Sequence, residues 1–233
     1  MKLGFTLAEV LITLGIIGIV SAMTLPTVIN NARDRQFKSM FKKQVSVISQ
    51  AIQMVYAKDG ASYTKVNWKD MSKFVCEVGM YMKTVGSGLN CSEILQLEET
   101  VDPNTSSIFS NPNVEWHQST KWYDKTGKPM GTNGAFMRYT FYLPDGALIN
   151  FNSVNQIFID VNGFKAPNTV GRDIFYIMLR DQSITTSFFE TNGKVSVNGY
   201  DCPNNCTELT KENYEEDCKN GTGWGCSPLY ILE

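Results

Sequence analysis

A single carboxylate, Glu9, stands near the start of an otherwise uncharged apolar run that covers residues 5–25. The run is about as long as the hydrocarbon core of a bilayer requires. A carboxylate placed there costs roughly 2.5–3.5 kcal/mol on insertion scales, so it should face a cationic partner. No Lys or Arg lies between Phe5 and Asn31. The cation must therefore come from another chain or from a new amino terminus made by proteolysis.

Cleavage after Gly4 would supply such a cation. The α-amino group of Phe5 would have an unperturbed pKa of about 8 and would be mostly protonated at neutral pH. A helix holds this amine about one turn away from Glu9 of the same chain, whereas a neighbouring subunit shifted along the axis can meet it. The charge pair would then set the register between stacked helices.

The stretch from Gly4 to Ile12, GFTLAEVLI, resembles the processing and methylation motif of type IV prepilins and type II secretion pseudopilins. The resemblance implies that a membrane aspartyl peptidase cuts after Gly4 and methylates Phe5. It also implies that Glu9 is the family's assembly glutamate and that Pro26 is its helix proline. The match covers about the first thirty residues, and the rest of the chain is similar in layout more than in identity.

The resemblance implies a structural subunit that is held in the bacterial inner membrane by a single span, with its head in the periplasm or at the cell surface. A cytoplasmic ATPase acting through an inner-membrane platform would assemble it into a type IV pilus or a type II secretion pseudopilus. Its partners would be other pilin or pseudopilin subunits, the prepilin peptidase, the assembly platform and the lipid bilayer. The elaborated loop and tail favour a minor subunit, and no feature separates pilus from secretion pseudopilus.

Two other interpretations of the N-terminus stay open. Val20, Ser21 and Ala22 form an acceptable signal-peptidase site, which would make the chain a secreted, disulfide-rich binding module. An ordinary uncleaved membrane anchor is the second. The early position of Glu9 is a poor feature for a signal peptide.

A second group of polar residues lies between residues 160 and 173. Asp160, Asn162 and Asp173 are hard oxygen donors at short spacing around Gly163, which suits calcium. The stretch resembles the calcium-binding loop of major pseudopilins. In the alternative interpretation, Asp160 and Asn162 shape a turn and Asp173 leads a strand. No cofactor is certain, and calcium is the one candidate.

The six cysteines predict disulfides, because an exported chain meets an oxidising compartment where zinc loses its advantage. Fifteen pairings exist for six cysteines. Proximity favours one bond between the first two and bonds among the tail four. The glycines and prolines of the tail predict little regular structure there. The cysteines are Cys76, Cys91, Cys202, Cys206, Cys218 and Cys226.

Composition and motifs argue against other classes. The formal net charge is -2. The short basic run from Arg33 to Lys43 follows the apolar segment and fits lipid headgroups better than a phosphate-reading surface, so nucleic acid is not expected as a primary ligand. His117 is the one histidine, and the chain has no metalloprotease, nucleophile-elbow, phosphate-loop or dinucleotide motif. We therefore do not expect an enzyme.

Hydrophobic periodicity predicts the elements that must position these residues. A helix is expected from residue 5 to 58, with a kink or local unwinding at Pro26 and an end at Asp59 and Gly60. A shorter helix is expected from residue 68 to 78. The apolar stripe of the long helix comprises Phe37, Phe41, Val45, Ile48, Ile52 and Val55.

Residues 84–134 are rich in Gly, Ser, Asn, Pro and Thr and predict a long surface loop region. Its aromatic residues Trp116, Trp122 and Tyr123 are expected to pin the loop to its own domain, and the alternative is a contact surface for another subunit or a carbohydrate. Four short antiparallel strands follow. The expected strands are 136–142, 147–151, 156–161 and 174–179, with turns at Pro144-Asp145-Gly146 and at Asn162-Gly163.

These elements predict an α+β pilin fold: a long N-terminal helix, membrane-spanning in its first half, packed on a four-stranded antiparallel sheet, with a disulfide-rich C-terminal tail. The expected organisation is a leader at 1–4, a membrane or filament-core helix at 5–30 and an extracytoplasmic head at 31–233. Within the head we expect a helix at 31–59, a variable loop region at 84–134, a sheet at 136–180 and a Cys-rich tail at 200–233.

Overall fold

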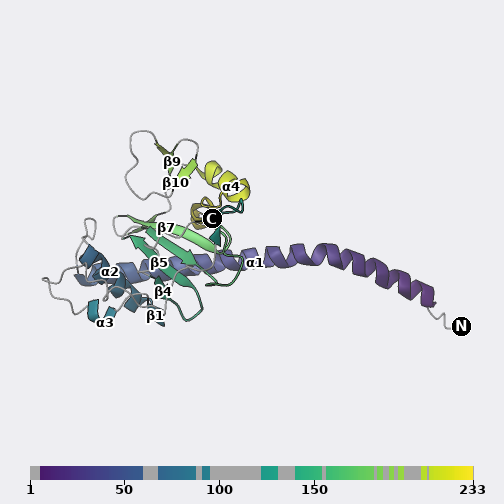
Figure 1. The fold of residues 1–233 in the computed structure, drawn as a ribbon, viewed down its shortest axis with the longest axis horizontal. Helices are drawn as coiled ribbons and strands as arrows, with labels where there is room; N and C mark the ends of the chain where they lie inside the picture. The colour runs from purple at the N-terminus through teal and green to yellow at the C-terminus, as the bar shows by residue number, and fades with distance from the viewer. Residues whose placement is uncertain are drawn as a thin grey trace. The chain divides into compact units, whose positions relative to one another are not determined.

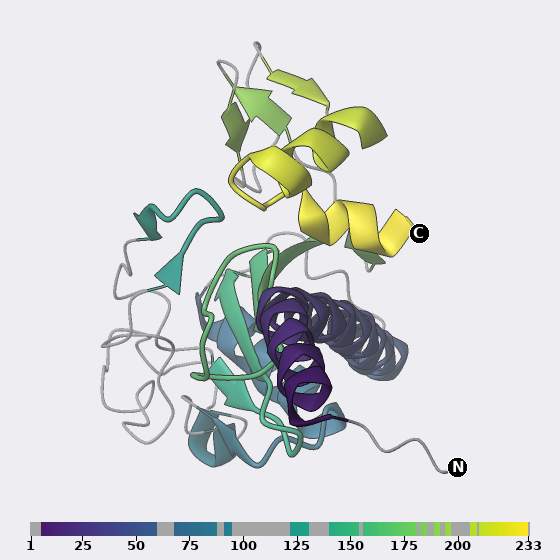
Figure 2. The same ribbon diagram turned by 90° about the vertical axis from the view of Figure 1, so that its right-hand side faces the viewer.

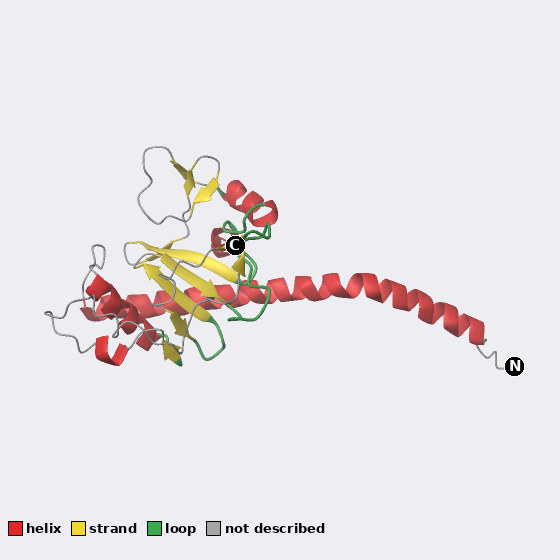
Figure 3. Ribbon diagram, viewed as in Figure 1, coloured by secondary structure: helices red, strands yellow, loops and turns green. Residues whose placement is uncertain are grey.

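The structure is a computed structural model, shown in Figures 1 and 3. It describes residues 6–59, 68–87, 91–94, 122–130, 140–153, 156–180, 183–185, 189–191, 194–196, 206–208 and 210–232. Gly4, Phe5, Trp116, His117 and Cys202 lie outside these ranges.

The chain divides into two compact units, Met1–Gln36 and Phe37–Glu233. The helices are α1 (Leu7–Asp59), α2 (Trp68–Tyr81), α3 (Cys91–Ile94), α4 (Lys211–Asn220) and α5 (Cys226–Leu232). The strands are β1 (Gly86–Ser87), β2 (Trp122–Tyr123), β3 (Pro129–Met130), β4 (Thr140–Tyr142), β5 (Leu148–Ser153), β6 (Gln156–Asp160), β7 (Ile174–Arg180), β8 (Ser183–Thr185), β9 (Phe189–Thr191), β10 (Lys194–Ser196) and β11 (Cys206–Glu208).

The first unit contains the N-terminal part of α1, and every side chain from residue 6 to residue 36 is exposed. Two threonine hydroxyls in this part bond to the helix's own carbonyls: Thr13 Oγ1 donates to Val10 O and Thr24 Oγ1 donates to Val20 O, each at 2.9 Å. The helix continues through Pro26. The unwinding expected at this proline therefore does not occur.

In the second unit, α1 presents the predicted stripe to the sheet. Phe41, Ile48, Ile52 and Val55 are at most 1% exposed, and Phe41 stacks on Phe175 of β7 with ring centroids 4.2 Å apart. Steps of three and four residues place these side chains on one side of a helix. Figures 1 and 2 show the central strands lying beside this part of α1.

The main sheet is antiparallel, with the strand order β1-β4-β5-β6-β7-β8. Among the described residues the sheet has six strands rather than four, because the short β1 and β8 extend the edges of the predicted strands at its centre. Residues 136–139 of the strand expected at 136–142 lie outside the described ranges. The turn at Pro144-Asp145-Gly146 is confirmed, and Gly146 has a φ of 88°. The Asn162-Gly163 signal was partly wrong, since β6 and β7 pair across a longer loop, 161–173, and not through a tight turn.

Both faces of this sheet are buried. Phe175 and its cross-strand partner Ile159 lie on the face toward α1. On the opposite face, Phe158 and Tyr176 are at most 4% exposed. The Trp122 ring of β2 meets Phe158 edge-on at 6.1 Å, as expected for an aromatic residue that pins a loop region to its own domain.

The tail is more regular than its glycines and prolines predicted. It contains α4 and α5, and β11 belongs to a small sheet of order β10-β9-β11. Asn213 Oδ1 accepts the N–H of Thr210 and so caps the start of α4. Pro228 lies in the first turn of α5, where no helical hydrogen bond requires its missing N–H. Because of this cap and the position of Pro228, the glycines and prolines of the tail do not prevent α4 and α5 from forming.

Truncating Phe41 should show how much the helix–sheet contact contributes. We expect Phe41→Ala to lower the free energy of unfolding by about 3–5 kcal/mol, because it removes a fully buried ring and leaves a cavity. Denaturant unfolding of the full chain in detergent measures this value. The matched control is Met54→Ala on the same helix, where the side chain is 50% exposed and the change should stay within about 0.5 kcal/mol. Equal losses in both variants would contradict the packing described here.

Candidate functional site

The start of α1 holds Glu9 by a contact within its own chain. Thr6 donates to Glu9 Oε2 from its backbone N–H and from its hydroxyl, each at 2.8 Å, and the Glu9 N–H donates back to Thr6 Oγ1 at 3.3 Å. This reciprocal arrangement is a capping box, in which the residue three positions after the N-cap reaches back to it. The sequence carries the signal for this box as Thr-x-x-Glu at residues 6–9.

The capping box does not neutralise Glu9. Its two donors are neutral groups, and the helix N-terminus adds only a partial positive charge. The carboxylate therefore has hydrogen-bond donors but, among the described residues, no full positive charge beside it. A full positive charge from elsewhere would still be stabilising in a medium of low dielectric constant.

The apolar part of α1 is long enough and apolar enough to cross a membrane, and none of its most apolar window is buried. Leu7 is 81% exposed and Met23 is 73% exposed. Methyl groups added at Gly15 or Gly18 would meet nothing within 4 Å. Large continuous apolar surfaces of this kind mark contact with lipid or with another protein.

The structure brings the predicted calcium candidates together on the loop between β6 and β7. Asp160 and Asp173 are fully buried. Asp173 accepts the N–H groups of Asn168 at 2.8 Å and Thr169 at 2.6 Å, while Asp160 Oδ1 accepts the N–H of Asn162 at 3.1 Å. These bonds fix the course of the loop, as the turn-shaping interpretation expects.

Two amide oxygens of the same loop remain available as ligands for a cation. Asn162 Oδ1 and Asn168 Oδ1 are buried and accept no hydrogen bond from any described residue. Burial raises the pKa of Asp173, although the N–H groups of Thr169 and Asn168 lower it in part. A cation nearby would therefore offset the free-energy cost of burying the ionised Asp173 carboxylate.

The donor set fits calcium in kind, because calcium takes carboxylate and amide oxygens. Among the described residues no group of three or more His, Cys, Asp or Glu side chains is placed to hold a metal ion, so the loop would offer at most two carboxylates. Asn168 had not been a candidate. Calcium binding stays a prediction, and Asp160, Asn162, Asn168 and Asp173 are the residues that would hold the ion.

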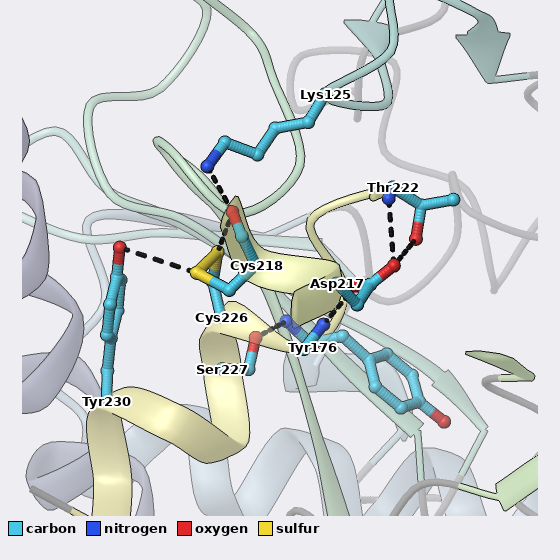
Figure 4. Close-up of a disulfide and its surroundings, with 9 residues drawn as sticks. Lys125, Tyr176, Asp217, Cys218, Thr222, Cys226, Ser227 and Tyr230 are labelled. Atoms are coloured by element: carbon cyan, nitrogen blue, oxygen red, sulfur yellow. Dashed lines mark hydrogen bonds between the residues drawn. A yellow bond between two sulfur atoms is a disulfide. The ribbon is translucent and has the colours of Figure 1, made fainter. Parts of the chain in front are cut away.

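Two disulfides are present among the described cysteines. Cys76 and Cys91 join α2 to α3, with Cα atoms 5.4 Å apart, and Cys218 and Cys226 join α4 to α5, with Cα atoms 4.6 Å apart. Figure 4 shows the second bond and its surroundings. The first pairing is the one expected from proximity, and the second joins two of the tail cysteines. Cys202 and the side chain of Cys206 lie outside the described residues, so the bond expected among the remaining tail cysteines stays a prediction.

Comparison with protein-family models, with curated protein sequences and with solved structures gives no match for this chain. Its function must therefore be inferred from its own residues.

Calcium should stabilise the head if the loop binds it. At a calcium concentration about 100-fold above Kd, we expect the Tm of the full chain in detergent to rise by about 5–10 °C. Asp173→Asn should abolish this rise, because it removes one of the two carboxylates. Differential scanning calorimetry with calcium and with magnesium measures both effects.

The matched control is Asp124→Asn. Asp124 is also buried, and its Oδ1 accepts the N–H groups of Thr126 and Lys128 in the β2–β3 turn, each at 2.9 Å. This variant should lose stability but keep the full response to calcium. An absent response in the wild-type chain, or an equal response to magnesium, would contradict calcium binding.

Proposed function

We propose that the chain is a pilin-like structural subunit that is anchored in the inner membrane, cleaved after Gly4, N-methylated at Phe5 and assembled into an extracytoplasmic filament through α1. It would serve as a minor subunit of a type IV pilus or of a type II secretion pseudopilus. The prepilin peptidase and the inner-membrane assembly platform are its expected partners, and no catalytic role is proposed.

One observation carries this proposal: α1 runs from Leu7 to Asp59 as a single helix with two different environments. Its first part exposes apolar side chains all round, while its later part buries one apolar stripe against the sheet. An apolar helix surface that its own chain does not bury needs lipid or other apolar helices. A subunit that moves from a membrane into a bundle of identical helices would meet both needs in turn.

The Thr6–Glu9 contact supports a role for charge at the subunit interface. The capping box provides hydrogen bonds to the carboxylate but no full positive charge. In the assembled filament, the α-amino group of Phe5 in a neighbouring subunit would supply it. Pairing of this kind permits only one axial offset between adjacent helices, so Glu9 would set the register.

The alternative is a secreted binding module that loses its N-terminal segment to signal peptidase. Cleavage after Ala22 would divide α1 within its apolar part and leave a helix that begins at Met23. Both of the described disulfides lie in the second unit and fit either function. The fate of residues 5–22 therefore distinguishes the two.

Intact mass and N-terminal peptide mapping of the chain from its native membrane or sheared-surface fraction should give a first residue of N-methylated Phe5. The resemblance of residues 4–12 to the prepilin motif is the reason for this expectation. A mature chain that begins at Met23 would instead identify a soluble export and exclude the pilin-like function.

Glu9 variants separate the charge from the capping role. Glu9→Gln keeps an amide oxygen that can accept from Thr6, and Gln is a normal capping-box residue, but it removes the charge. We expect Glu9→Gln and Glu9→Ala to reduce filament incorporation to a similar degree, by about tenfold or more, since a lost pair of about 1.4 kcal/mol has that effect. Subunit content of sheared filaments, normalised to membrane levels, gives the measurement.

Thr24→Val is the matched control, because Thr24 lies in the same apolar segment and donates only to Val20 of its own helix. It should assemble normally. If Glu9→Gln also assembled normally while Glu9→Ala did not, the carboxylate would act as a helix cap and the register proposal would fail.

A further inference from the structure

Two of the lysines that follow the apolar segment have partners within the second unit. Lys43 Nζ lies 2.6 Å from Asp145 Oδ2 in the β4–β5 turn. Lys38 Nζ lies 4.7 Å from the centroid of the Tyr230 ring on α5, where the negative face of the ring attracts a cation. These two contacts join α1 to the turn and to α5, so the charges of both lysines contribute to the packing of the head.

Arg33 and Arg35 differ from these lysines. Both belong to the first unit, and both side chains are exposed. Neither forms an ion pair or a side-chain hydrogen bond with any described residue, whereas Asp34 between them interacts with another part of the chain. An arginine keeps its positive charge at every pH that a folded protein meets. The first unit therefore ends in two full positive charges without a partner among the described residues.

The spacing along α1 places the two arginines at the depth of lipid headgroups. From Leu7 to Ile29 the helix rises by about 33 Å, which is enough to cross a hydrocarbon core of about 30 Å. Arg33 and Arg35 follow Ile29 by about 6 Å and 9 Å of helix rise, and the headgroup layer is roughly 5–7 Å thick on each side. Helical side chains lean toward the N-terminus of their helix, so both guanidinium groups reach back toward the bilayer.

The two arginines face different sides of α1. Residues two apart are separated by about 200° around a helix, so Arg33 and Arg35 do not face each other. Every side chain from residue 6 to residue 36 is exposed, so both sides of the helix are accessible here. A protein partner docked on one side would meet one arginine and miss the other. Lipids surround a membrane helix and can meet both.

The distribution of charge at the two ends of the apolar segment also favours a role in lipid contact. In membrane proteins the excess of Lys and Arg lies on the cytoplasmic side and directs insertion. In the orientation that the proposed function requires, the cytoplasmic end carries Lys2, which cleavage after Gly4 removes, and the two arginines stand at the opposite surface. Charges placed against the usual bias do not direct insertion, and a contact with lipid phosphate accounts for them.

We propose that Arg33 and Arg35 are two binding sites for the phosphate groups of anionic phospholipids, one lipid on each side of α1. Each guanidinium donates two hydrogen bonds to the phosphate oxygens of its own lipid. A zwitterionic lipid binds more weakly, because its phosphate is balanced by its own ammonium group. The two contacts fix the depth of α1 in the bilayer. They require the apolar segment but neither cleavage after Gly4 nor filament assembly, so this proposal does not depend on the proposed function.

Native mass spectrometry of the full chain in detergent tests the two sites, because it resolves each bound lipid. The chain is titrated with phosphatidylglycerol and, separately, with phosphatidylcholine. We expect two molecules of phosphatidylglycerol to bind more tightly than any phosphatidylcholine. Arg33→Gln and Arg35→Gln should each remove one of them, with affinity at that site falling by about fivefold or more. Higher concentrations of ammonium acetate should weaken both sites.

Two double variants serve as controls. Arg33→Lys/Arg35→Lys keeps both positive charges and should still retain two lipids. Lys128→Gln/Lys211→Gln removes the same charge from exposed positions of the second unit, and it should leave phosphatidylglycerol binding unchanged.

Several results would overturn the proposal. Equal affinity for the two lipids, or tight phosphatidylglycerol binding that survives in Arg33→Gln/Arg35→Gln, would show that the arginines do not select anionic lipid. Equal weakening in Lys128→Gln/Lys211→Gln would assign the preference to net charge. Loss of both lipids in either single variant would show one shared site. Dimers that form without added lipid and disappear in Arg33→Gln/Arg35→Gln, with lipid binding unchanged, would identify a second copy of the chain as the partner.

Discussion

The contact between the apolar stripe of α1 and one face of the main sheet is the interaction on which the head depends. Phe41 stacks on Phe175 in this contact, and the other buried positions of the stripe extend it along the helix. Because the same helix continues toward the N-terminus as an apolar rod, the helix that organises the core of the head also carries the segment that can enter a membrane. One helix thus contributes residues to both compact units.

The second face of the sheet makes the head a layered structure. A helix that covers one face would normally leave the other to solvent, yet Phe158 and Tyr176 are buried there by Trp122 and Trp224. Their contacts join residues that are far apart in the chain. The predicted loop region and the tail would be expected to lie on the surface, yet through Trp122 and Trp224 they contribute to the core.

Much of the fold could be predicted from the sequence, because α1, α2 and the four central strands have strong local periodicity. Strands β1 and β8 are too short to show alternation. Gly221 and Pro228 argue against helices α4 and α5 in the sequence, and only the structure shows that Gly221 follows the end of α4 and that Pro228 lies in the first turn of α5. At the candidate sites, Glu9 was visible as a charge in an apolar run. Asn168 was not, since only the folded loop shows that its amide oxygen accepts no hydrogen bond within the described part of the chain.

The close approach of Gly171 in the β6–β7 loop to Gly223 of the tail has a consequence for how related chains can differ, because a Cβ added to Gly171 would overlap Gly223 O. Gly171 has a φ of 76°, a conformation that asparagine also adopts, as Asn168 does in the same loop. With the tail in this position, however, any side chain at 171 meets backbone atoms, and no change of residue at 223 can remove them. Descendants of this chain can therefore accept asparagine at 171 only together with a shortened or displaced tail. Glycine at that position and the presence of the tail should be inherited together.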